Sequence, residues 1–473
     1  MLTRLEVDGF KNLLDVKIDF GPHTCIAGPN AVGKSNLFDA IQFLSLLTDN
    51  SFMDAAQLLR LGGTRATDPR VLFWTDGTNV APTMSFAAEM IVPRVVEDDF
   101  GRVVEARSTF LRYELRLSYV PPEPSSLTRM SAISLDHESL TYIRLGDASD
   151  HIRWPHSKAN FRDDVLVQRK FGTAFISTSV EDGYSVIKVH QDGGSRGQPR
   201  SSPAIRAQRT IVGTTNSVED PTILAARREM QQWRLLALEP TSMRAPDSYT
   251  DPGRIGPDGS HLAATLFRMV SEQSENVYGD VAAEASALVD VREVKVDADP
   301  HRETLTLQAR IGNGPILPAR GLSDGILRFL ALCIISGDPE FGGVLCMEEP
   351  ENGIHPAKIP AMVDLVRDLA VDPQFPPGSD NPMRQVIVNT HSPYYVQMQN
   401  PNDLLLAMPA AVRRNGNTTL TTRYLPLDDT WRTSKLGITG VSLQTILDYL
   451  REPDNAPLRL PFEWNERLAT TGN

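Results

Sequence analysis

A glycine-rich segment near the start of the chain has the residue types of a phosphate-binding loop. Gly28 and Gly33 are separated by four residues, and Lys34 and Ser35 follow at once. Glycines let the backbone curl so that successive N–H groups point at one phosphate. The lysine of such a loop reaches the terminal phosphates of a nucleoside triphosphate, and its serine hydroxyl binds Mg²⁺. We therefore predict that ATP and Mg²⁺ bind to Gly28, Pro29, Asn30, Ala31, Val32, Gly33, Lys34, Ser35 and Asn36.

The residues around this loop support the prediction. Residues 23–27 form an apolar stretch typical of a buried strand, and residues 36–47 have the apolar spacing of a helix. A helix that starts at the loop adds the positive end of its dipole to the anion site. The alternative is an ordinary glycine-rich turn between a strand and a helix, but that interpretation leaves Lys34 unexplained.

Three further segments carry residue types suited to phosphate chemistry. Leu322, Ser323, Asp324 and Gly325 directly precede a helical apolar stretch, where a hydroxyl, a small residue and a helix N-terminus all favour an anion. The run VLCMEEPENGIHP (344–356) and the run QVIVNTHSP (385–393) each begin with a buried strand pattern. They place Glu348, Glu349 and His391 where their strands end.

Taken in order, these segments resemble the ABC-type ATPase heads of the RecF, SMC and OLD kind. The similarity is strongest to a coil-free group of bacterial RecF-like ATPases in the AAA superfamily. That group carries an LSDG-x-x-R signature, an EEPENG-x-HP Walker B and D-loop segment and a THSP switch histidine, as this chain does. The opening turn 9–12 (GFKN) and the run 255–262 (IGPDGSHL) also resemble the group, and the resemblance covers residues 1–75 and 235–425.

The resemblance implies an ATP sandwich formed by two chains. Glu349 would be the general base that orients the attacking water, and His391 would sense the γ-phosphate. Ser35 and Glu348 would hold Mg²⁺; many relatives have aspartate at the second position, and glutamate is one methylene longer. The further nucleotide contacts that it implies are Lys11 and Asn12 of the same chain and Ser323, Asp324 and Gly325 of the other chain.

Each of these signals has a simpler interpretation when it is taken alone. A Ser-Asp pair before an apolar helix is a common helix cap, an acidic run can be a solvated turn, and a single histidine is more often a structural residue. His355 is interpreted as structural, and residues 60–63 as a helix end followed by a turn. Arg328 fits either a nucleotide-state switch or an ion pair within its helix. The joint order of the motifs favours function for the signature, Glu349 and His391.

We predict an α/β fold: a P-loop NTPase of the ABC-ATPase type, with a mixed, mainly parallel sheet flanked by helices, an antiparallel β lobe and an inserted variable region. The expected parts are 1–80 and 221–433 for the ATPase head, 81–220 for the β lobe and insertion, and 434–473 for a tail with a helix. We expect a helical region over 259–289 that breaks near Gly279, and a loop over 193–217.

The amino-acid composition excludes several classes of protein. The chain has 473 residues, 41% of them apolar and 22% charged, which excludes a disordered chain. Three cysteines without a C-x-x-C pair exclude a disulfide framework and a zinc ribbon. No apolar stretch approaches the length of a membrane span, and no signal peptide is visible, so we expect a cytoplasmic protein without a membrane partner.

The net charge of −12 repels nucleic acid overall, so contact with DNA needs a local basic patch. The segment 193–217 contains no acidic residue. A solvated variable loop is the alternative interpretation of this segment. The predicted DNA contacts are Arg196, Arg200, Arg206 and Arg209.

We predict an ATP-hydrolysing homodimer whose closure controls DNA or a separate effector protein, in DNA repair or anti-phage defence. OLD-type nucleases carry a Toprim domain after the head, but no spaced acidic cluster follows His391, so we expect any nuclease to be a separate chain. Two alternatives remain: an energy-coupling ATPase subunit of a transporter, and a nucleotide-locked binding module with negligible turnover.

Overall fold

The computed structural model describes residues 1–59, 68–77, 79–122, 131–169, 172, 174–192, 198–414 and 417–451. The predicted turn at 60–63, Arg196 and the end of the tail lie outside these residues. No helix within the described ranges is long and apolar enough to cross a bilayer.

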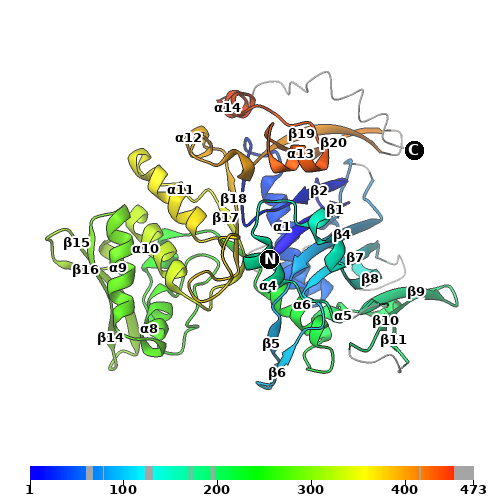
Figure 1. The fold of residues 1–473 in the computed structure, drawn as a ribbon, viewed down its shortest axis with the longest axis horizontal. Helices are drawn as coiled ribbons and strands as arrows, with labels where there is room; N and C mark the ends of the chain where they lie inside the picture. The colour runs from blue at the N-terminus through cyan, green and yellow to red at the C-terminus, as the bar shows by residue number, and fades with distance from the viewer. Residues whose placement is uncertain are drawn as a thin grey trace.

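A six-stranded sheet forms the centre of the molecule, in the order β12-β17-β18-β3-β19-β20 (Figure 1). All neighbours are parallel except the last pair. Apolar side chains of β17 alternate between two hydrophobic clusters, one on each face of the sheet. Both faces are therefore covered, as expected for parallel strands with near-continuous apolar sequences. The strands are β12 Arg234–Leu236, β17 Gly343–Glu348, β18 Arg384–Thr390, β3 His23–Ala27, β19 Leu404–Arg414 and β20 Asn417–Pro426.

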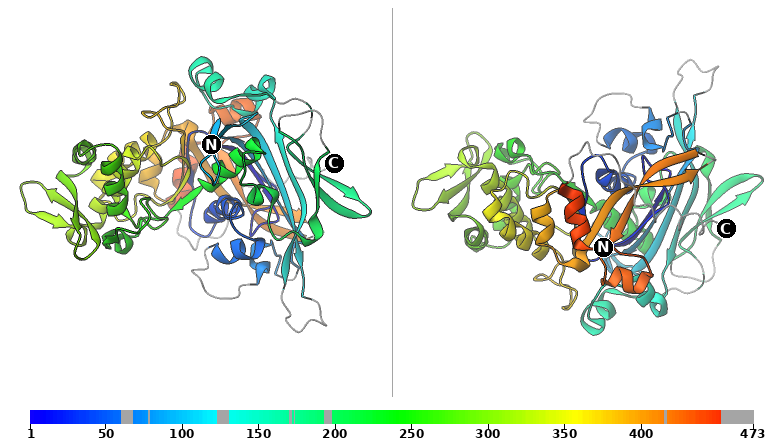
Figure 2. Two further views of the ribbon diagram at one scale, coloured as in Figure 1. Left: turned by 90° about the horizontal axis from the view of Figure 1, so that it is seen from below. Right: turned by 90° about the horizontal axis from the view of Figure 1, so that it is seen from above.

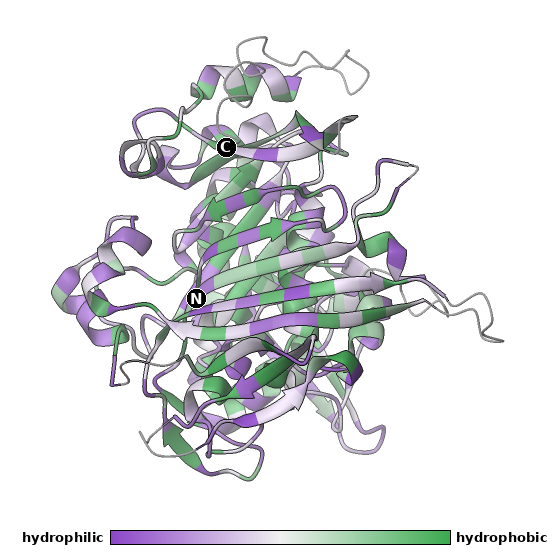
Figure 3. Cartoon of the chain, turned by 90° about the vertical axis from the view of Figure 1, so that its right-hand side faces the viewer, coloured by the Kyte–Doolittle hydropathy of each residue, from purple (hydrophilic) through white to green (hydrophobic). Residues whose placement is uncertain are grey.

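One face of the central sheet packs against helices and a second, antiparallel sheet of eight strands. Its order is β11-β10-β9-β8-β7-β4-β1-β2, so the opening strands and the predicted β lobe form one continuous sheet. Hydrophilic and hydrophobic residues alternate along its strands (Figure 3), which marks one buried and one solvated face. The strands are β1 Leu2–Asp8, β2 Val16–Asp19, β4 Thr83–Ile91, β7 Phe110–Val120, β8 Ala132–Tyr142, β9 Ile176–Glu181, β10 Tyr184–Val189 and β11 Arg200–Pro203.

Helix α1 (Lys34–Leu46) lies between the two sheets and is fixed there by aromatic packing. The ring of Phe43 lies 5.9 Å from that of Phe10 and 5.8 Å from that of Phe86, and all three are buried. Full burial of each such ring contributes about 1.5–3 kcal/mol. Because α1 begins at the phosphate loop, this packing also fixes the position of the loop.

The second face of the central sheet is covered by a lobe that lies at the end of the molecule opposite the antiparallel sheet (Figure 2). The predicted break near Gly279 is wrong. α8 ends at Glu272 and α9 begins at Asn276, so the helices separate in the polar run 271–276 (SEQSEN), while Gly279 lies inside α9. The lobe contains α7 Pro240–Arg244, α8 Leu262–Glu272, α9 Asn276–Leu288, α10 Asp324–Gly337, α11 Ile359–Asp368, β13 Asp247–Ser248, β14 Val291–Asp299, β15 Thr304–Ile311 and β16 Ile316–Pro318.

The described part of the segment predicted as a loop, 198–217, is more ordered than expected. β11 pairs with β10, and a short helix, α5 (Ile211–Thr214), follows. The fully buried carboxylate of Glu138 on β8 accepts the N–H groups of Ile211 at 2.7 Å and Val212 at 3.0 Å. A single buried acid therefore anchors this segment to the sheet, which a local sequence pattern does not reveal.

The described part of the tail packs on its own head. Ile446 and Leu447 of α14 (Leu443–Arg451) are buried in the same cluster as Tyr395 and Val396 of α12 (Pro393–Gln397). The remaining helices and strands are α2 Phe52–Leu58, α3 Ala148–His151, α4 Asp163–Val165, α6 Pro221–Gln231, α13 Trp431–Leu436, β5 Val95–Glu97 and β6 Val103–Glu105.

The buried carboxyl of Glu138 predicts that the free energy of unfolding depends on pH. Burial raises the pKa of this carboxyl to about 7 in the folded chain. A pKa that is raised by folding means that the native state binds the proton more tightly than the unfolded state. The contribution of Glu138 to the free energy of unfolding is therefore fully present below the pKa of the unfolded state, and it is lost as the pH rises through the pKa of the folded state. We expect Glu138→Gln to flatten the fall in melting temperature between about pH 5 and pH 8.

Thermal unfolding across this pH range measures the effect. Glu181→Gln, an exposed acid whose pKa is lowered beside Lys188, is the matched control because it titrates below this range. An identical pH profile for the wild type and Glu138→Gln would contradict the assignment.

Candidate functional site

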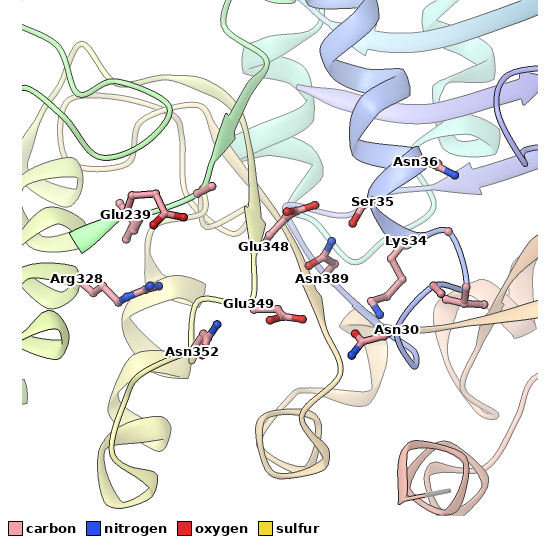
Figure 4. A pocket seen from close by; sticks show the side chains of 15 residues that line it. Asn30, Lys34, Ser35, Asn36, Glu239, Arg328, Glu348, Glu349, Asn352 and Asn389 are labelled. Atoms are coloured by element: carbon pink, nitrogen blue, oxygen red, sulfur yellow. The ribbon is translucent and has the colours of Figure 1, made fainter. Parts of the chain in front are cut away.

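The carboxyl ends of β3, β17, β18 and β12 meet around one cavity of about 430 Å³ (Figure 4). Four predicted motif residues, Lys34, Ser35, Glu348 and Glu349, line it. In Figure 4, Glu348 lies beside Ser35, while Glu349 and Lys34 point into the same space. The structure thus joins two segments that lie more than 300 residues apart in the chain. The lining residues are Asn30, Ala31, Val32, Gly33, Lys34, Ser35, Asn36, Ala237, Leu238, Glu239, Arg328, Glu348, Glu349, Asn352 and Asn389.

The phosphate loop has the backbone geometry that its glycines allow. Gly33 has a φ of 106°, in the left-handed region, and a Cβ there would meet Asn12 Nδ2 at 2.2 Å. A Cβ at Gly28 would meet the carbonyl oxygen of Ala407 at 2.7 Å. Lys34 is buried, and its Nζ donates to the carbonyl oxygens of Gly28 at 2.5 Å and Pro29 at 2.8 Å. Both glycines are therefore required by the close packing of the loop.

The cavity fits a nucleoside triphosphate with Mg²⁺. Helix α1 begins at its wall without a side-chain cap and without an acidic residue in its first turn. Uncapped N–H groups and the positive end of the dipole favour an anion. The hydroxyl of Ser35 and the carboxylate of Glu348 line the cavity, and both are oxygen groups of the kind that Mg²⁺ takes beside phosphates. The volume of the cavity falls in the range of small-molecule sites.

Glu349 and His391 form a pair at the edge of this cavity. Glu349 Oε1 lies 2.6 Å from His391 Nδ1, and the backbone of Glu349 has a φ of 47°, in the left-handed region. The N–H of Glu349 donates to the carbonyl oxygen of Asn389 at 2.9 Å. His391 is half-exposed and does not line the cavity itself. A strained backbone held by a neighbouring strand is typical of residues positioned for function.

A second connection joins the same two turns. The Thr390 hydroxyl donates to Glu351, and the N–H of Ser392 donates to the Thr390 hydroxyl at 2.9 Å. Burial raises the pKa of Glu351. The turn after β17 and the turn after β18 are thus connected by backbone, by side chains and by the Glu349–His391 contact.

Lys11 and Asn12 lie against the phosphate loop and do not line the cavity. Lys11 Nζ pairs with the buried carboxylate of Asp39 on α1 at 2.6 Å. Asn12 donates to the carbonyl oxygen of Val32 at 3.3 Å and accepts from Asn36 at 2.8 Å. In this structure, Asn12 therefore bonds to the loop and to the start of α1, while Lys11 bonds to α1 alone.

The predicted signature lies away from the cavity of its own chain. Ser323 caps α10 by accepting the N–H of Ile326 at 3.4 Å. Ser323, Asp324 and Gly325 do not line the cavity, whereas Arg328 on the same helix does. Arg328 Nε is buried without a hydrogen-bond partner among the described residues. This position favours a nucleotide-related role for Arg328 over an ion pair within its helix.

Five lining residues were not predicted from the sequence: Ala237, Leu238, Glu239, Asn352 and Asn389. Glu239 follows β12, and Asn389 is the penultimate residue of β18. The rule that parallel strands end at one edge of a sheet could have identified both. His355 caps a short helical turn by accepting the N–H of Ala357 at 3.2 Å, which agrees with a structural role.

The arginines predicted to contact DNA are not equivalent. Arg200 pairs with Asp220 and lies 3.7 Å from Glu219, so the acids that follow the segment neutralise it. Arg206 and Arg209 are exposed. Arg196 lies outside the residues that the structure describes.

Two protein-family models match the chain. One is described as "AAA domain, putative AbiEii toxin, Type IV TA system" and matches residues 203–396. The other is described as "AAA domain" and matches residues 4–80. Between them, the models span the phosphate loop, the signature, Glu349 and His391.

Curated relatives match over a short segment. The chain is 42% identical over 62 residues to the "DNA replication and repair protein RecF" of Lactobacillus gasseri, and 38% identical over 63 residues to that of Lactococcus lactis subsp. cremoris. The matches cover 13% of this chain and only 17% and 18% of those proteins.

Solved structures with a similar course of the chain include SMC heads. An SmcHead bound to the C-winged helix domain of ScpA is 15% identical, with 90% of this chain and 98% of that chain covered and a TM-score of 0.47. The Pyrococcus furiosus Smc head with an extended coiled coil, bound to the C-terminal domain of ScpA, is 13% identical, with 89% and 96% covered and a TM-score of 0.43.

We expect Lys34→Ala to weaken the binding of ATP by about 10- to 100-fold, because it removes a charge-assisted hydrogen bond to the terminal phosphates. Titration with a fluorescent ATP analogue measures this. Lys358→Ala, an exposed lysine away from the cavity, is the matched control. Equal affinities in both variants would show that the cavity is not the nucleotide site.

Proposed function

We propose that the chain is an ABC-type ATPase head of the RecF kind, which binds Mg·ATP in the cavity at the end of β3 and hydrolyses it. The single observation that carries the proposal is the meeting of Lys34, Ser35, Glu348 and Glu349 around one cavity. A loop that binds phosphates and a carboxylate that orients water are the two parts that phosphoryl transfer to water requires.

Each residue has a defined task in this mechanism. The N–H groups of the loop and Lys34 would hold the β- and γ-phosphates. Ser35 and Glu348 would hold the metal, which would supply charge neutralisation for the phosphates. Glu349 orients a water for attack in line with the leaving oxygen. His391, fixed at 2.6 Å from the Glu349 carboxylate, senses whether the γ-phosphate is present. Asn389 and Asn352 add amide groups to the wall.

The active form is a homodimer with two nucleotides between the subunits. The cavity of one chain holds the phosphate loop and Glu349 but lacks the signature, since Ser323 and Gly325 lie outside it. The signature nevertheless presents a helix N-terminus to solvent, with Asp324 half-exposed. A second copy that places this N-terminus over the γ-phosphate completes the site. Binding of ATP therefore favours the closed dimer, and hydrolysis releases it.

The dimer acts on DNA or on a separate effector protein such as a nuclease, in DNA repair or anti-phage defence. Arg206 and Arg209, which are exposed, are its DNA contacts, whereas Arg200 is paired with Asp220 and Arg196 lies outside the described residues. Closure brings two such arginine pairs into one assembly, which offsets the repulsion that a net charge of −12 per chain imposes.

We expect steady-state ATP hydrolysis by the wild type and a loss of about 100-fold or more in Glu349→Gln, because the amide cannot act as a base. The release of phosphate, with and without linear duplex DNA, measures both. Stimulation by DNA that Glu349→Gln loses would support coupling to DNA. Turnover that is the same in both proteins, with ATP still bound, would instead identify a nucleotide-locked binding module.

We expect Arg206→Ala/Arg209→Ala to weaken DNA binding and to reduce the slope of log affinity against log salt concentration by about two. Fluorescence anisotropy with a labelled duplex at several salt concentrations measures this. Arg292→Ala/Arg302→Ala, which removes two exposed arginines from the opposite lobe, is the control. If both double variants bind DNA as the wild type does, the segment is not the DNA contact.

A further inference from the structure

The signature of this chain contains a carboxylate where phosphate is expected to bind. Asp324 is the first residue of α10, directly between Ser323 and Gly325, and its side chain is 53% exposed. A carboxylate in the first turn stabilises the helix through the dipole. The same charge repels a triphosphate that approaches the helix N-terminus. The closed dimer therefore needs a positive group beside Asp324.

Arg244 supplies such a group. Its Nη2 atom donates to Asp324 Oδ1 and, at 3.1 Å, to the carbonyl oxygen of Leu322. The guanidinium thus contacts the residues on both sides of Ser323. Its side chain is 30% exposed, so the pair lies at the surface that a second copy would cover.

Arg244 is held in place by a short, rigid element. It is the last residue of α7, which begins at Pro240, directly after the cavity residue Glu239. α7 packs against α10. One end of α7 therefore lies at the nucleotide cavity of its own chain, and the other end lies at the signature, which serves the other chain.

We propose that Arg244 is a positioning residue that neutralises Asp324, so that Ser323 and Gly325 can face the triphosphate held by a second copy of this chain. The inference rests on the proposed ATP sandwich. It assigns Arg244 a task in assembly of the site rather than in the chemistry at Glu349.

The alternative is a clamp that only fixes α7 to α10. Other arginine–carboxylate pairs of the same lobe, such as Arg254 with Glu340 at 3.2 Å, have no signature residue beside them. If the pair only fixes α7 to α10, both side chains are needed. Loss of either side chain would then weaken the dimer to the same extent. A neutralising arginine is needed only while Asp324 is charged. The two roles therefore differ in the effect of a second substitution at Asp324.

The experiment uses the full chain in the Glu349→Gln background, which should hold ATP without turnover. Light scattering after size-exclusion chromatography gives the protein concentration for half-maximal dimer at saturating Mg·ATP. The added substitutions are Arg244→Ala, Asp324→Asn, both together, and Arg254→Ala as the control. Melting temperatures of all variants verify that each one folds.

We expect Arg244→Ala to raise the concentration for half-maximal dimer by about tenfold or more, because an unpaired carboxylate then faces the phosphates. Asp324→Asn alone should dimerise at least as well as the parent, and the double variant should return to within about threefold of it. Arg254→Ala should not differ from the parent.

Three outcomes would overturn the inference and leave the proposed function intact. The first is an unchanged dimer in Arg244→Ala. The second is equal damage by Arg244→Ala and Asp324→Asn, which indicates a clamp. The third is a double variant as poor as Arg244→Ala, which indicates direct contact of Arg244 with phosphate. If the Glu349→Gln parent stays monomeric with ATP, the ATP sandwich itself is wrong, and the inference is overturned with it.

Discussion

The parallel pairing of β3 with β18, and of β18 with β17, is the constraint on which the site depends. In this register Ala27 lies opposite Thr390, and Asn389 opposite Glu348. The residues that follow, which are the phosphate loop, His391 and Glu349, therefore leave the sheet at one edge and at one level. A shift of one residue would turn Glu348 and Asn389 to the opposite face. The buried, two-sided packing of these strands fixes the register, so the hydrophobic core sets the geometry of the chemistry.

The turn after β17 carries the strain of this arrangement. Glu349 adopts a positive φ, which costs a non-glycine residue on the order of 1 kcal/mol or more. Its N–H bond to Asn389, its contact with His391 and the bond of Thr390 to Glu351 offset that cost. Together they connect the carboxylate that would orient water to the histidine that would sense phosphate.

Much of this fold could be predicted because β3, β17 and β18 are each a compact apolar run followed by a short polar motif. The phosphate loop, Glu348, Glu349 and the turn of His391 are specified by residues adjacent in sequence, so local patterns were sufficient. Contacts between residues far apart in the chain could not be predicted from local sequence patterns. The anchoring of Ile211 and Val212 by Glu138 joins positions far apart in the chain, and a local pattern shows only a loop there.

Some residues to which the sequence analysis gave no role were missed for a related reason. Glu239 and Asn389 reach the cavity only because their strands end beside β17, and Arg244 reaches the signature only because α7 packs on α10. The predicted helix break near Gly279 gave this glycine too large an effect on the helix. A glycine inside a helix costs only about 1 kcal/mol, whereas the polar run at 271–276 has no apolar side chain to bury.

With their N-cap residues included, helices α7 and α10 each carry a residue that lines the cavity of the chain and a residue at its signature. α7 has Glu239 before its first residue and Arg244 at its last, and α10 has Ser323 at its cap and Arg328 less than two turns later. Glu239 and Arg328 face the cavity of the same chain, while Arg244 and Ser323 lie at the signature. Because both elements pack in one buried cluster, we expect a displacement of Glu239 or Arg328 to be passed on to Arg244 and Ser323. In the proposed ATP sandwich, the nucleotide held by one chain would therefore affect the surface that the same chain offers to the nucleotide of the other.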